Sequence, residues 1–134
     1  MRRLYIAIFF VSAAAIGYEI LLMRVLSVVQ WHHFAYMIIS LALLGYGASG
    51  AFIALFRRTL ESHFEAAFAI SALLFSITMV ACFVAGQLVP FNALELIWDY
   101  RQIPLLSLMY LVFFVPFFFA ACCFGLALTC RSDG

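Results

Sequence analysis

The sequence predicts an all-α, polytopic integral membrane protein with four transmembrane helices and a short interfacial helix between the third and the fourth. The first observation behind this prediction is composition: the 134 residues are 69% hydrophobic and 10% charged. Soluble domains are usually about 45–50% apolar and about 25% charged, and a chain of this length cannot bury so much apolar surface in water. The second observation is four apolar segments, each reaching the ~20 residues that a ~30 Å hydrocarbon core requires.

The predicted spans cover residues 4–29, 34–56, 63–88 and 103–129, which together form one transmembrane helical domain. The first span resembles a signal peptide because Arg2 and Arg3 precede it, but the apolar run continues past the small residues 13–15. Ser62 and Glu65 have the spacing of a capping box at the start of the third span. Pro116 removes one backbone hydrogen bond from the fourth span and predicts a kink there.

Residues 91–102 form the only long connection between predicted spans. Apolar side chains share one helical face of this segment, and its acidic side chains lie mostly elsewhere. That pattern predicts a short amphipathic helix lying in the membrane interface. The acidic pair Glu95 and Asp99 is either a solvated face or a cation site.

The arginines are distributed unequally between the two sides that four spans define. One side carries five of them and the other carries two: Arg2, Arg3, Arg57, Arg58 and Arg131 against Arg24 and Arg101. The positive-inside rule therefore predicts that both termini are cytoplasmic. The net charge of +1 gives no electrostatic reason to expect nucleic acid as a partner.

We expect no cofactor and no metal. The four cysteines lie in apolar sequence without metal-site spacing. The adjacent His32 and His33 would point about 100° apart on a helix, which does not suit one ion. The glycine-rich residues 45–50 lack the lysine of a phosphate-binding loop and lie within an apolar helix.

Small residues in the second span predict close helix packing. Gly45 with Ser49, and Gly47 with Ala51, are small-xxx-small pairs, and Gly50 adds a further small residue. Such pairs let two backbones approach closely, which is how helices associate in lipid. We expect both pairs to meet another helix, either within this chain or in a partner.

Glu19 and Arg24 are the charged residues of the first span. At about 1.5 Å per residue, Glu19 lies about 22 Å into a core of about 30 Å, whereas Arg24 can reach the far interface. They are five residues apart, so they do not form an i,i+4 pair. Glu19 is therefore expected to face the bundle interior. It would either form hydrogen bonds that hold helices together or serve as a proton or ligand site. The residues at the same depth are Ser40 on the second span, Thr78 on the third, and Ser107 to Tyr110 on the fourth. Ser40 or Thr78 is the expected hydrogen-bond partner of Glu19.

Several motifs resemble the amino-terminal membrane part of bacterial membrane-bound spermidine-synthase-like proteins, which are polyamine aminopropyltransferase-like. The motifs are Tyr18-Glu19 with Arg24, then residues 31–36, 42–50, 98–102, 115–119 and 123–128. The resemblance implies a bacterial inner-membrane location and a bundle that, in family members, continues into a Rossmann-like domain for S-adenosyl-type ligands. The glycine fingerprint of such a domain does not occur in these residues, so the family's transfer residues have no counterparts here.

Three functions follow as expectations, none of them an enzyme acting alone. The first is a structural or anchoring membrane module without its own catalytic domain. The second is an accessory subunit of a larger, energy-transducing membrane complex. The third is a small transport or ligand-binding bundle that uses Glu19 and Arg24. The expected partners are the lipid bilayer and other transmembrane subunits, including further copies of this chain.

Overall fold

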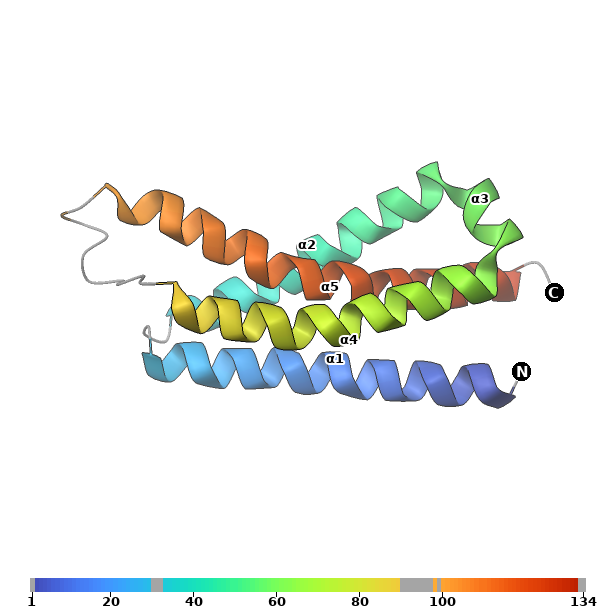
Figure 1. The fold of residues 1–134 in the computed structure, drawn as a ribbon, viewed down its shortest axis with the longest axis horizontal. Helices are drawn as coiled ribbons and strands as arrows, with labels where there is room; N and C mark the ends of the chain where they lie inside the picture. The colour runs from blue at the N-terminus through green and yellow to red at the C-terminus, as the bar shows by residue number, and fades with distance from the viewer. Residues whose placement is uncertain (1, 30–32, 90–97, 99, 133–134) are drawn as a thin grey trace.

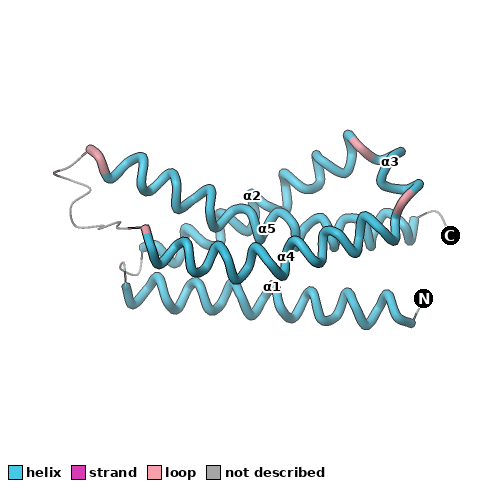
Figure 2. The backbone as a smooth tube through the Cα atoms, in the orientation of Figure 1, coloured by secondary structure: helices cyan, strands magenta, loops and turns pink. Residues whose placement is uncertain are grey.

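The computed structural model describes residues 2–29, 33–89, 98 and 100–132 of the chain, and every regular element in them is a helix (Figures 1 and 2). The helices are α1 (Arg2–Val29), α2 (His33–Leu55), α3 (Arg57–Ser62), α4 (Phe64–Leu88) and α5 (Gln102–Ser132). All of them except the short α3 are long and apolar enough to cross a membrane. The predicted all-α fold with four membrane-spanning helices is confirmed.

Each long helix begins and ends close to its predicted limits. The largest difference is at the end of α5, which continues to Ser132 rather than 129. The predicted interfacial helix at residues 91–102 lies almost entirely outside the described residues. Of that segment the structure describes Trp98, Tyr100 and Arg101, which form a turn, and Gln102, which already belongs to α5.

The polar composition of residues 57–62 predicts a short loop between the second and third spans, but the structure has the helix α3 there. Ser62 is the last residue of α3, and its hydroxyl donates to the carbonyl oxygen of Thr59 over 2.9 Å. His63 is the N-cap of α4 and makes no capping side-chain hydrogen bond. The predicted capping box of Ser62 and Glu65 is therefore wrong: Ser62 is held by the turn that precedes the cap.

The bundle is organised around α5, which packs extensively against both α2 and α4 and less extensively against α1. Its buried aromatic residues Phe113 and Phe117 join α1 and α2 side chains in the main core cluster, with Leu22, Ile38 and Leu41 among the most buried members. Figure 1 shows α5 changing direction near its middle, and Pro116 lies within this helix. The predicted kink agrees with this bend, since proline removes a backbone donor and clashes with the preceding turn.

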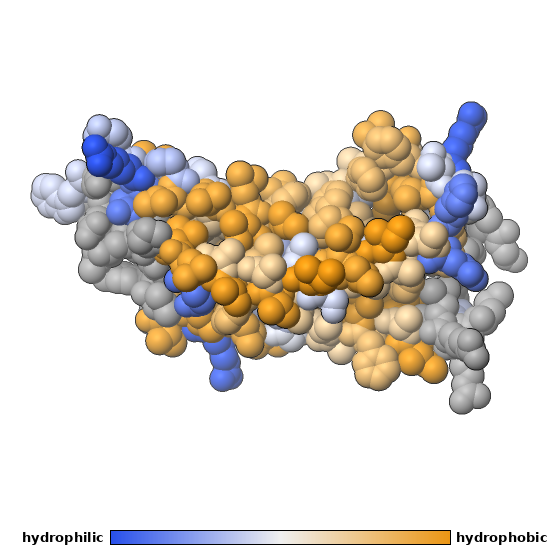
Figure 3. All heavy atoms as spheres, in the orientation of Figure 1, coloured by the Kyte–Doolittle hydropathy of each residue, from blue (hydrophilic) through white to orange (hydrophobic). Residues whose placement is uncertain are grey.

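The outer surface is apolar along most of the bundle. Figure 3 shows hydrophobic side chains across the middle of the visible face and hydrophilic ones gathered toward the two ends. Large side chains such as Phe9 and Phe10 are about two-thirds exposed, at 68% and 65%. A surface of this kind is stable in a bilayer, where lipid tails rather than water surround it. The chain is thus a multi-pass membrane protein by length and composition of its helices.

The first residues of α1 and the last residues of α5 lie at the same end of the bundle (Figure 1). The helix α3, which carries Arg57 and Arg58, lies at that end too. The opposite end holds the last residues of α1 and α4 and the first residues of α2 and α5. This arrangement brings the arginine-rich segments of the sequence together at one end of the bundle.

Candidate functional site

The predicted polar site on α1 does not form a charged pair. Glu19 is half-buried and Arg24 is exposed. Within the described part of the chain, neither side chain makes an ion pair or a hydrogen bond. Their separation of five residues turns them to different sides of α1, as expected from helix geometry.

The hydroxyls of Ser40 and Thr78 bond within their own helices. Ser40 donates to the carbonyl oxygen of Tyr36 over 3.2 Å, and Thr78 donates to that of Leu74 over 2.6 Å. The predicted hydrogen bond from either residue to Glu19 is therefore not formed. Serine and threonine in helices satisfy themselves in this way because the carbonyl four residues earlier is always within reach.

The structure places Glu19 near a different polar group, the hydroxyl of Tyr46 on α2. The Glu19 carboxylate lies close enough to act electrostatically on this phenol, although the two do not hydrogen-bond. The Tyr46 ring lies 6.1 Å from that of Phe124 on α5, measured between centroids. Tyr110, the remaining member of the predicted polar layer, is exposed on α5.

The Gly45 and Ser49 pair faces α5. A Cβ added to Gly45 would lie 2.9 Å from the Cβ of Phe117 and 3.0 Å from its carbonyl carbon. Ser49 is only 3% exposed, and its hydroxyl donates to the carbonyl oxygen of Tyr46 over 2.9 Å. The absence of a side chain at Gly45 therefore sets how closely α2 and α5 approach.

The Gly47 and Ala51 pair lies on the opposite side of α2, away from the helix α5 that Gly45 contacts. Gly47, Gly50 and Ala51 are all exposed. A Cβ added to Gly47 or Gly50 would meet no described heavy atom within 4 Å. We call these three residues the α2 small-residue face.

Two further close packing positions were not predicted from the sequence. The ring of Phe113 packs against Gly86 on α4, where an added Cβ would overlap it. The end of the Ile53 side chain packs in the same way against Gly125 on α5. Both glycines are isolated in apolar sequence, so no spacing pattern marked them. Their role becomes visible only when the facing helix is known.

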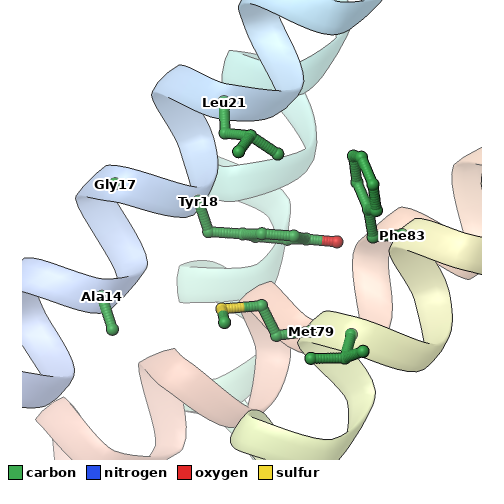
Figure 4. A pocket seen from close by; sticks show the side chains of 7 residues that line it. Ala14, Gly17, Tyr18, Leu21, Met79 and Phe83 are labelled. Carbon is green, nitrogen blue, oxygen red and sulfur yellow. The ribbon is translucent and has the colours of Figure 1, made fainter.

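A hollow lies between α1 and α4, whose backbones make little direct contact. It has a volume of about 360 Å³ and is lined by Ala14, Gly17, Tyr18, Leu21, Met79, Val80 and Phe83. Figure 4 shows the Tyr18 ring extending from α1 toward α4, with its hydroxyl beside Phe83 and Met79 below the ring. We call this hollow the α1–α4 groove.

Tyr18 contributes the polar atom of the groove. The side chain is only 5% exposed, and its hydroxyl is buried without a hydrogen-bond partner in the structure. Its ring centroid lies 5.7 Å from that of Phe117. The sequence does contain a signal for this residue: Ala15, Tyr18, Leu22 and Leu26 repeat at helical spacing, so Tyr18 falls on the buried stripe of α1.

The described residues hold no group of three histidine, cysteine or acidic side chains that would bind a metal ion. Cys82, Cys122 and Cys123 are free thiols among apolar neighbours. Comparison of the chain with protein-family models, curated proteins and solved structures found no match.

Proposed function

We propose that the chain is a membrane-embedded structural module, a four-span bundle that assembles with another transmembrane chain through the α2 small-residue face. The supporting observation is the division of α2 into two sides. Gly45 and Ser49 are used inside the bundle against α5, whereas Gly47, Gly50 and Ala51 stay open. Small residues on a lipid-facing helix surface favour close association with a second helix.

The partner helix that this face fits best is α2 of a second copy. A Gly47-xxx-Ala51 pair is self-complementary, because each helix offers the same shallow surface to the other. A subunit of a larger membrane complex is the alternative partner and would bury the same face. The two partners are distinguished by the composition of the extracted assembly: two copies of this chain in the first case, and this chain with a different subunit in the second.

The test is Gly47→Leu in the full chain, with assembly mass measured by native mass spectrometry in mild detergent. Wild type is expected to contain two copies of the chain, and Gly47→Leu is expected to be monomeric because leucine separates the backbones. The matched control is Ala69→Leu, which adds bulk to an exposed position on α4. A monomeric wild type, or an unchanged dimer in Gly47→Leu, contradicts the proposal.

The resemblance to spermidine-synthase-like membrane proteins supports an anchoring role for this module. In that role the bundle holds a soluble domain at the cytoplasmic face of a bacterial inner membrane, with both ends of the chain on that side. The coding sequence that follows Gly134 tests the anchoring role. A nucleotide-binding domain there supports it, and a stop codon favours the role of a separate subunit.

A further inference from the structure

The α1–α4 groove has a buried hydroxyl that lacks an acceptor. A buried polar group without a partner costs roughly 1–3 kcal/mol, and native proteins leave few of them unexplained. The Tyr18 side chain lines a hollow between two helices, and its buried hydroxyl lies beside Phe83, with Met79 below the ring (Figure 4). Both neighbours are on α4, which is not packed tightly against α1.

The depth of Tyr18 restricts which molecules can supply the acceptor. The apolar span of α1 is Tyr5–Val28, and Tyr18 lies within two residues of its midpoint. Whether depth is counted from this midpoint or from residue 4, Tyr18 lies within about 6 Å of the centre of a ~30 Å core. The ester carbonyls of phospholipids lie at the edge of the core, about 15 Å from its centre. Neither a phospholipid headgroup nor water therefore reaches this hydroxyl. An acceptor that comes from outside the chain is therefore an oxygen that an apolar molecule carries into the hydrocarbon core.

The dimensions of the groove favour a small molecule over a helix. Its lining extends from Ala14 to Leu21 on α1 and from Met79 to Phe83 on α4, or about 10 Å and about 6 Å of helix. A helix with side chains is about 10–12 Å wide and does not enter such a slot. A volume of about 360 Å³ lies at the lower end of the usual ~300–1,000 Å³ for small-molecule sites.

The lining also suits a flat ring. Ala14 and Gly17 offer little side chain on the α1 wall, and a Cβ added to Gly17 would meet no described atom within 4 Å. On the α4 wall, Phe83 can stack on an aromatic or quinonoid ring, and the Met79 sulfur packs well at a ring edge. A carbonyl on that ring would accept the hydrogen bond that Tyr18 has free to donate.

We infer that the α1–α4 groove binds a membrane-dissolved cyclic ketone of the quinone class, with a ring carbonyl accepting a hydrogen bond from Tyr18. The apolar tail of such a molecule stays in the surrounding lipid, since the groove is open on that side next to exposed Leu21 and Val80. Binding requires small movements of the Met79 and Phe83 side chains. It does not require the α2 assembly, because the groove lies between other helices.

The test uses the full chain in phosphatidylcholine nanodiscs and a photoreactive azido-ubiquinone with a short tail. Label is expected on residues 14–21 and 79–83, mapped by mass spectrometry, and unlabelled decylubiquinone should prevent it. Tyr18→Phe is expected to need roughly fivefold to tenfold more decylubiquinone for the same protection, as the loss of one neutral hydrogen bond implies. Tyr5→Phe, on the exposed part of α1, is the matched control and should behave as wild type.

Folding of the variant is checked separately. Tyr18→Phe removes a hydroxyl that has no partner in the structure, so its Tm is expected to equal or exceed that of wild type. Label spread evenly over all spans, or equal protection in Tyr18→Phe and wild type, overturns the inference. Protection by dodecylbenzene as strong as that by decylubiquinone would show a slot for hydrocarbon only. A changed oligomeric state with unchanged protection would assign the hydroxyl to a protein partner.

Discussion

Glu19 is the acidic residue placed deepest in a predicted span, and the structure leaves it half-buried, within electrostatic range of the Tyr46 phenol. Its carboxyl group makes no hydrogen bond to any residue that the structure describes. A carboxyl group in this position contributes little to holding the helices together, and it lowers the preference of α1 for the hydrocarbon core.

We therefore predict that Glu19→Gln leaves the Tm of the purified bundle nearly unchanged and that Glu19→Leu raises it. Glutamine keeps the shape of the side chain, and leucine removes the cost of a polar group in lipid without breaking a bond of the structure. Thermal unfolding in detergent, followed by circular dichroism, measures both variants.

Arg24→Leu is a useful companion variant, because Arg24 is exposed near the end of α1 and also lacks an ion pair among the described residues. A fall of several degrees in the Tm of Glu19→Leu, with Arg24→Leu unchanged, would contradict the account. It would mean that Glu19 holds helices together after all. Loss of activity in Glu19→Gln with full stability would instead identify a proton or ligand site.

The polar partners of Glu19 were the least predictable feature of this molecule. Counting residues along each span gives the depth of Ser40 and Thr78, but depth says nothing of the direction in which a side chain points. Both hydroxyls also have an acceptor in their own helix, and a hydrogen bond to that acceptor forms without any contact to another helix. The proximity of Tyr46 to Glu19 depends on how α2 is rotated against α1, which residue counting does not give.

At the scale of the elements, α2 is the helix whose two sides differ most. Gly45 lies against the backbone of α5, whereas Gly50 faces open space. Alanine normally stabilises a helix relative to glycine by about 1 kcal/mol. At a position where the added methyl group has no room, this gain is lost and the neighbouring backbone has to move.

We predict that Gly45→Ala destabilises the bundle by about 1–3 kcal/mol, the usual cost of overpacking. Gly50→Ala is the matched control in the same helix and is expected to be neutral or slightly stabilising. Unfolding in detergent by a denaturant titration measures the two free energies. Equal effects of the two substitutions would show that α2 and α5 do not approach at Gly45.

Hydropathy predicted the long helices well because a helix in lipid has to satisfy its own backbone hydrogen bonds over the full apolar run. The rotation of each helix was not predictable in the same way. Gly45 and Gly47 begin equivalent small-xxx-small patterns but point about 200° apart, so only one of the two pairs can face α5. The helix α3 was missed because residues 57–62 are polar, and polarity alone does not distinguish a short helix from a loop.

At the scale of the whole molecule, the bundle is held together by α5, while α1 is attached less extensively. This loose attachment leaves the α1–α4 groove open on one side, and the α2 small-residue face is free on another. The groove is suited to bind a small molecule dissolved in the membrane, and the α2 small-residue face is suited to bind a second transmembrane helix. Both depend on four helices crossing the bilayer with the two ends of the chain on one side.

Cysteine accessibility in intact bacterial cells tests that arrangement most directly. A cysteine is added at position 1 or 134, or placed by Ser62→Cys on α3 or by Tyr100→Cys in the opposite connection, where both native side chains are exposed. The native protein, labelled in parallel, gives the background from its four cysteines, of which Cys122 and Cys123 are buried and Cys82 is partly exposed. We predict that a membrane-impermeant maleimide labels only Tyr100→Cys in intact cells and labels the other three only after permeabilisation. Labelling of positions 1 and 134 from opposite sides of the membrane would contradict the four-span bundle.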